Sequence, residues 1–160
     1  LLQNEYAGTV TVVNPFGAVL SQNKLTLALM WEAQEHFSPL ARRWIRRYIP
    51  ATYRLTQLDP DMLLAQRQAW VLKSAYGCEG EETICGPYVS DAAWREVVTG
   101  VLPDYWVAQR FFHAAVTPDG GVPNYGVYVV GGRSVGFFTR VATIATDVYA
   151  MTAPTFIARG

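Results

Sequence analysis

Five polar or aromatic side chains in the C-terminal half could do acid–base chemistry if a curved sheet brought them together. They are Tyr105, Trp106, Arg110, His113 and Asp147. A histidine titrates near neutral pH, and a neighbouring arginine and carboxylate can orient a substrate, so this set suits a pocket at the mouth of a sheet. Ordinary sheet residues are the simpler interpretation. The five residues are therefore a candidate pocket, and no catalytic residue is assigned.

The stretch from Gly132 to Gly136 matches the Gly-x-Ser-x-Gly pattern of a nucleophile elbow. An elbow needs a strand, a sharp turn and a helix, followed by a histidine later in the chain. Here a strand is predicted after Ser134, and both His36 and His113 precede it. The order His113, Asp119, Ser134 would suit a two-barrel protease, which 160 residues with three predicted helices do not supply. A glycine-rich hairpin turn is the better interpretation.

Cys78 and Cys85 are separated by six residues of an acidic, glycine-bearing loop. This spacing allows the two thiols to close a small ring, so we predict a disulfide formed in an oxidising compartment. A pair of reduced thiols is the alternative. Neither histidine lies near the cysteines in sequence, so too few ligands are present for zinc and no metal site is predicted.

The segment from Ser38 to Ile49 predicts an amphipathic helix, because Ser38 can cap it and Pro39 suits its first position. Its apolar residues fall at the spacing of one helix face and are predicted to be buried: Leu40, Ala41, Trp44, Ile45, Tyr48 and Ile49. The remaining positions form an arginine ridge, namely Arg42, Arg43, Arg46 and Arg47. The ridge could bind phosphates, be solvated, or pair with acids of a neighbouring subunit, and we predict a partner-binding surface.

Composition limits the classes of protein to which the chain can belong. Its length of 160 residues predicts a single domain, 1–160. The formal net charge is zero, so no overall field attracts the chain to nucleic acid or to an anionic membrane. Hydrophobic residues make up 51%, with five tryptophans and nine tyrosines, which favours a surface that meets a partner. There is no transmembrane-length apolar run and no evident signal peptide, so we expect any membrane anchor to precede Leu1.

Three helices are predicted to form a helical layer over residues 24–103. The first runs from Leu25 to Phe37 and bends into the Ser38 segment. The second begins at Asp59-Pro60 and carries an apolar stripe to a cap at Gly77, and the third begins at Ser90.

Strands are predicted on both sides of this helical layer. A short N-terminal strand, Gly8 to Val13, ends in a turn within residues 1–23. Residues 104–160 are predicted to form a four-stranded antiparallel meander, with strands over 105–116, 125–130, 133–146 and 148–157. The fold class is therefore α+β, with three helices packed on a curved four-stranded sheet.

This order of elements resembles the nuclear-transport-factor-2-like fold. Several segments are more specifically similar to the periplasmic domain of the bitopic inner-membrane subunit of type IV secretion and conjugation machines. These segments are Val10 to Gly17, Leu40 to Arg46, Asp59 to Trp70, and Ala75-Tyr76.

The resemblance implies a non-enzymatic assembly domain on the periplasmic side of the inner membrane. Its partners would be other subunits of the secretion apparatus, and it would form a homo-oligomer. It implies no cofactor, no direct contact with nucleic acid, and a membrane link only through an anchor outside this chain. Two alternatives stay open. One is a small-molecule enzyme or ligand-binding protein with its pocket in the mouth of the sheet, and the other is a structural subunit of a virion or another large particle.

Overall fold

The computed structural model describes residues 2–11, 17–77, 82–144 and 149–157. Its α-helices are α1 (Leu2–Tyr6), α2 (Ala18–Gln22), α3 (Leu25–Glu32), α4 (Pro39–Tyr48), α5 (Pro60–Ala65) and α6 (Asp91–Gly100). Its 3-10 turns are η1 (Gln34–His36), η2 (Leu55–Gln57), η3 (Arg67–Ala69), η4 (Gly86–Tyr88) and η5 (Pro103–Tyr105). Its strands are β1 (Thr52–Arg54), β2 (Trp70–Ser74), β3 (Thr83–Cys85), β4 (Trp106–Arg110), β5 (Val122–Val130), β6 (Arg133–Ala142) and β7 (Met151–Ala153). The α+β class is confirmed.

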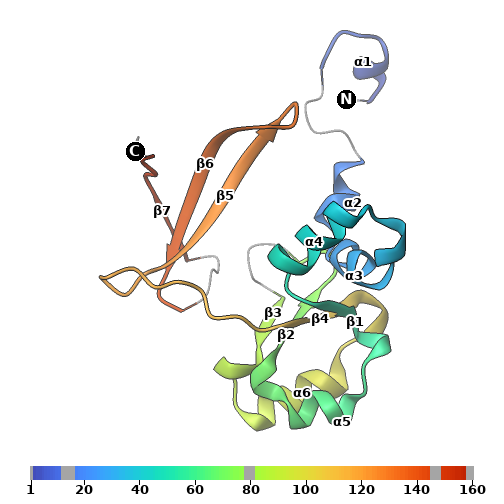
Figure 1. The fold of residues 1–160 in the computed structure, drawn as a ribbon, viewed down its shortest axis with the longest axis vertical. Coiled ribbons are helices and arrows are strands. Elements are labelled where there is room, and N and C mark those ends of the chain that lie inside the picture. The colour runs from blue at the N-terminus through green and yellow to red at the C-terminus, as the bar shows by residue number, and fades with distance from the viewer. Residues whose placement is uncertain (1, 12–16, 78–81, 145–148, 158–160) are drawn as a thin grey trace.

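The strands form two separate antiparallel sheets. One sheet has four strands in the order β1-β4-β2-β3, and the other has three in the order β5-β6-β7. Figure 1 shows the four-stranded sheet among the helices, with the orange hairpin of β5 and β6 standing to one side of it. The space between the two sheets is where the candidate site lies.

The main core lies between the four-stranded sheet and the pair α5 and α6. Successive strand residues point to opposite faces, and Trp70 and Leu72 of β2 point to this one. They pack with Leu63 of α5 and Trp94 of α6, and the Trp94 indole Nε1 donates to the Leu63 carbonyl at 2.9 Å. The core therefore leaves Val71 and Lys73 of the same strand on the opposite face.

Two helix starts follow the predicted capping chemistry. The Ser38 hydroxyl accepts a hydrogen bond from the Ala41 amide at 3.2 Å, with Pro39 in the first turn of α4. The Ser90 hydroxyl accepts one from the Ala93 amide at 3.2 Å at the start of α6. Both predictions are confirmed, because a cap depends on residues within one turn of each other.

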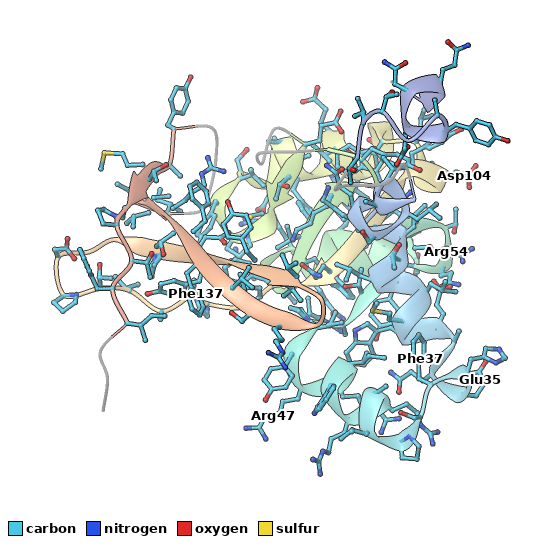
Figure 2. All side chains as sticks on the ribbon, turned by 90° about the horizontal axis from the view of Figure 1, so that it is seen from above. Glu35, Phe37, Arg47, Arg54, Asp104 and Phe137 are labelled. Atoms are coloured by element: carbon cyan, nitrogen blue, oxygen red, sulfur yellow. The ribbon has the colours of Figure 1, made fainter. Side chains whose placement is uncertain are left out.

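The facing predicted for α4 is wrong. Trp44 is 53% exposed and Ile45 only 6% exposed, so the helix packs through the side that carries Ile45. Leu40 and Tyr48 are exposed along with Trp44. Figure 2 shows Arg47 at the outer edge of the molecule, on the same helix. The periodicity predicted the helix but not which of its apolar residues is buried.

Two predicted elements of the N-terminal half are also wrong. Residues 8–11 form no strand and instead follow α1 through a turn with Gly8 at φ +70°, while residues 12–13 lie outside the described part of the chain. The helix predicted from Asp59 to Gly77 ends at Ala65 and gives way to β2. The apolar run of β2 is buried on both faces of a sheet, and such a run cannot be distinguished from a buried helix by its periodicity.

The predicted four-stranded meander, and with it the nuclear-transport-factor-2-like description, is not supported. The strand expected over 105–116 is limited to β4, which pairs with β1 and β2 rather than with β5. The turn predicted at Gly131-Gly132 is confirmed, since both residues have positive φ, +57° and +76°, between β5 and β6. Ser134 therefore lies in a hairpin strand and not on a nucleophile elbow. Within the described residues, none of the helices has the length and hydrophobicity needed to cross a membrane.

Candidate functional site

A cavity of about 500 Å³ lies between the four-stranded sheet and the beginning of β5. The four-stranded sheet supplies Val71, Lys73, Thr83, Cys85, Gln109 and Arg110. The segment that follows β4 supplies Phe111, Phe112 and His113, and the opposite wall includes Val122 and Asn124. Lys24, which comes just before α3, also reaches the cavity. The volume lies in the range of pockets that bind small molecules and cofactors.

The register of the sheet explains why Val71, Lys73, Thr83, Cys85 and Gln109 share one face, whereas Arg110 lies opposite Trp70 at the end of β2. Val71 lies directly opposite Gln109 on β4 and opposite Cys85 on β3, and Lys73 lies opposite Thr83. Directly opposed residues of antiparallel strands point to the same side of a sheet. The cavity therefore occupies the face of β2 that the main core does not use.

Lys73 is a charged side chain that lines the cavity from β2. Its ammonium Nζ donates to the side-chain oxygen Oε1 of Gln109 at 2.7 Å. Burial lowers the pKa of Lys73, and the positive charge of Lys24 lowers it further, while Cys85 acts in the opposite direction. An ammonium carries three N–H donors, so the bond to Gln109 leaves donors that can reach an anionic ligand.

Lys24 also lines the cavity, and it is hydrogen-bonded to residues that directly follow β2. Its amide donates to the Ala75 carbonyl at 2.9 Å, and its Nζ donates to the Gly77 carbonyl. Lys24 and Lys73 are the two lysines of the whole sequence, and both line this cavity. Together with Arg110, three basic side chains thus line one cavity in a chain of zero net charge.

Arg67 fixes the wall of the cavity that carries Cys85 and Tyr88. Its guanidinium donates to the carbonyls of Gly86 and Val89, and its Nε lies 2.6 Å from Oδ1 of Asp91. A Cβ on Gly86 would lie 1.9 Å from the Arg67 carbonyl oxygen, so only glycine fits there. These hydrogen bonds and the close approach of Gly86 to Arg67 therefore hold the segment from β3 to α6 against η3.

Aromatic rings surround the other end of the cavity. The Phe111 ring meets the Tyr88 ring edge-on with centroids 5.6 Å apart, and it meets the His113 ring at 5.0 Å. The Arg110 guanidinium, which also borders the cavity, stacks at 3.9 Å over the ring of Trp70, a residue of the main core. The cavity thus has a cationic part near Lys73 and an aromatic part near Phe111.

The family model described as glutathionylspermidine synthase preATP-grasp matches residues 1–158, nearly the whole chain. The chain belongs to this family. No individual curated protein matches the chain significantly.

Membership of the glutathionylspermidine synthase preATP-grasp family overturns the resemblance to a type IV secretion domain. The family is named for an enzyme, so the prediction of a non-enzymatic assembly domain of a secretion apparatus is wrong. The alternative prediction, an enzyme or ligand-binding protein with a pocket beside a sheet, agrees better with the family. The predictions of a homo-oligomer and of a periplasmic location stay predictions.

The structure brings together two of the five residues of the predicted pocket. Arg110 and His113 both line the cavity of this preATP-grasp chain. Tyr105 lies in η5 and is exposed, and Trp106 packs against the main core. Asp147 lies outside the described residues.

The arginine ridge borders a separate surface hollow of about 430 Å³, lined by Pro39, Arg42, Arg43, Arg46 and Arg47. Arg46 donates through Nε to Oε1 of Gln34 at 2.8 Å, and the Arg47 guanidinium lies 5.6 Å from the centre of the Tyr48 ring. Among the described residues, the ion pairs between a carboxylate and an arginine involve Arg54 and Arg67 and not the ridge. Partner binding by the ridge stays a prediction.

Cys85 is a half-buried thiol in the wall of the cavity. Burial raises its pKa, and the charge of Lys73 partly offsets that effect. Cys78 lies outside the described residues, so the bond between Cys78 and Cys85 stays a prediction. The described part of the chain holds no group of three or more histidine, cysteine or acidic side chains placed to bind a metal ion.

Sequence reasoning missed the central residues, Lys73, Lys24 and Gln109. The apolar residues around Lys73 fit a helical stripe and therefore predict a helix, whereas Lys73 lies in β2. The scarcity of lysine was the available signal, since two lysines among 13 basic residues are unusual and both serve one site. The glycines at 77, 80 and 86, following a run of large apolar residues, were a second signal for a strand and a loop.

Proposed function

We propose that the cavity between the two sheets binds ATP, and that the chain is part of an ATP-dependent ligase that joins a carboxylate to an amine. The observation that carries this proposal is the convergence of both lysines, Lys24 and Lys73, on one cavity beside a sheet. Ammonium groups are common ligands of phosphate oxygens. Both lysines lie at one half-buried surface in a chain of zero net charge.

The family name agrees with this chemistry. Glutathionylspermidine contains an amide between glutathione and spermidine, and forming an amide from a carboxylate and an ammonium in water is unfavourable. Coupling to ATP removes this obstacle, since ATP, the carboxylate and the ammonium become ADP, phosphate, the amide and one proton. A binding site for the phosphates of ATP is therefore what such an enzyme requires.

The lining of the cavity fits the two halves of a nucleotide. Lys73 and Lys24 suit the phosphates, and Val71 with the rings of Phe111 and Phe112 suits a purine base. Aromatic faces stack on bases without needing a particular hydrogen-bond pattern. We place the base toward Phe111 and the phosphates toward Lys73, because these are the apolar and the cationic parts of the same cavity.

Calorimetric titration of the protein with ATP and Mg²⁺ tests this function. The variant Lys73→Met removes the charge while keeping a long side chain, and we expect it to weaken ATP binding at least about tenfold, the loss of one charge-assisted hydrogen bond. The matched control is Arg133→Met, which removes an exposed positive charge at the hairpin, away from the cavity. Wild-type protein that does not bind ATP, or Lys73→Met protein that binds it normally, would refute the proposal.

A further inference from the structure

Lys73 is held by a chain of hydrogen bonds that crosses three strands. From this chain we infer that Gln109 and Thr52 are positioning residues, which hold the Lys73 ammonium toward the phosphates of the bound nucleotide. The inference rests on the proposed ATP site for its ligand. The position of Lys73 itself can be measured without ATP.

The register places the members of this chain on one face of the sheet. Thr52 on β1 lies directly opposite Gln109 on β4, and Gln109 lies directly opposite Val71 on β2. Lys73 is two residues beyond Val71, so it points to the same face and reaches Gln109 diagonally. The donor–acceptor distances are 2.7 Å from Lys73 Nζ to Gln109 Oε1 and 2.9 Å from Gln109 Nε2 to Thr52 Oγ1.

The Thr52 hydroxyl determines which end of the Gln109 amide faces Lys73. Its one hydrogen is donated to the Pro50 carbonyl at 2.8 Å, and a carbonyl can only accept. Thr52 Oγ1 must therefore accept from its other neighbour, which requires the NH₂ end of the Gln109 amide. The amide oxygen is then directed at Lys73, where an ammonium needs an acceptor.

Burial of Thr52 and Gln109 limits the hydrogen-bond partners available to the Gln109 amide. Thr52 is 0% exposed and Gln109 is 4% exposed, so water cannot readily replace either partner. Thr52 does not border the cavity, whereas Gln109 and Lys73 do. Thr52 therefore makes no direct contact with a ligand in the cavity, and its specific route to such a ligand is the hydrogen bond to Gln109.

The alternative is that Thr52 and Gln109 are a buried polar pair that only satisfies its own hydrogen bonds. Such a pair would affect stability, and its loss would act on binding only through general loosening of the sheet. The two roles differ in how the variants combine. They also differ in whether the Lys73 amine changes its environment.

The first measurement is ATP affinity in a double-mutant cycle. We expect Thr52→Val to weaken ATP binding about tenfold, because the unanchored amide can turn its NH₂ end toward Lys73, and we expect Thr52→Ser to retain affinity. Gln109→Met should weaken binding by a similar factor. Adding Thr52→Val to Gln109→Met should have no further effect. Additive losses in the double variant, or a Thr52→Ser variant as weak as Thr52→Val, would overturn the positioning role.

The second measurement reports on Lys73 with no nucleotide present. Reductive methylation with ¹³C-formaldehyde labels the amines of Lys24, Lys73 and the N-terminus, which NMR can resolve and a Lys73→Arg variant assigns. The Lys73 signal should shift in Thr52→Val and stay at the wild-type position in Thr52→Ser. An unmoved signal in folded Thr52→Val protein would overturn the inference. Shifted signals in a protein that fails to bind ATP would refute the proposed ligand while supporting the positioning of Lys73.

Discussion

The Lys73 ammonium and the Cys85 thiol face the same cavity from neighbouring strands, and each alters the pKa of the other. Burial is the largest effect on both, and it lowers the pKa of Lys73 and raises that of Cys85. Burial disfavours the charged form of either group, so the two shifts have opposite signs. Their contributions to stability at alkaline pH therefore oppose each other.

Replacing Lys73 should make the protein lose more stability with rising pH. The folded protein releases the Lys73 proton at a lower pH than the unfolded chain does, so the unfolded chain binds more protons and stability rises toward the ordinary lysine pKa of about 10.4. Lys73→Met lacks this gain. Urea unfolding at pH 8 and pH 10, with a reducing agent present, should show a larger loss of unfolding free energy in Lys73→Met than in wild type. Equal slopes would mean that Lys73 is not desolvated.

Replacing Cys85 should have the opposite effect. The folded protein keeps the thiol proton to a higher pH than the unfolded chain, so stability is fully present below the ordinary pKa of about 8.5 and is lost as pH rises through the folded value. Cys85→Ala removes this loss and should lose less stability than wild type between pH 8 and pH 10. The same urea series measures it, and a steeper loss in Cys85→Ala would contradict the burial of this thiol.

Neighbouring residues of α4 should differ sharply in their importance for folding. Ile45 is buried and Trp44 is exposed, so Ile45→Ala should lower the unfolding free energy by about 2–5 kcal/mol. Trp44→Ala should change it by no more than about 0.5 kcal/mol, as is usual for surface positions. Chemical denaturation of both variants checks this. A greater loss in Trp44→Ala would indicate that α4 is rotated about its axis and packs through Trp44 instead of Ile45.

Two glycines provide a matched test of the contact between Gly86 and Arg67. A Cβ at position 86 would overlap the Arg67 carbonyl, whereas a Cβ at position 100 would enter open space at the end of α6. Gly86→Ala should therefore destabilise the protein by about 1–3 kcal/mol, or more if the wall cannot move. Gly100→Ala should be neutral or stabilising by up to about 1 kcal/mol, because alanine favours a helix. Thermal melting of the pair checks the prediction, and equal melting temperatures would contradict the close contact.

Structural features that depend on residues close together in the chain could be predicted from the sequence. The starts of α4 and α6 were predictable, because the hydroxyls of Ser38 and Ser90 bond to amides three residues away. The hairpin turn at Gly131-Gly132 was predictable as well, since two consecutive residues with positive φ favour glycine. The α+β class follows from the same kind of local signal, the change of periodicity along the chain.

Tertiary contacts decided the rest, including the site. The segment from Trp70 to Ser74 fits a helix or a strand by pattern, and pairing with β3 and with the distant β4 made it a strand. That pairing turned Lys73 toward Gln109 and away from the core. Trp44 is exposed because α4 packs through the side that carries Ile45, and the pattern of one helix does not show which of its apolar residues is covered by the rest of the chain. The sequence alone determined which residues could cap helices, which could form tight turns and which carry charge. Strand pairing between distant segments determined that the two lysines, 49 positions apart, face one cavity.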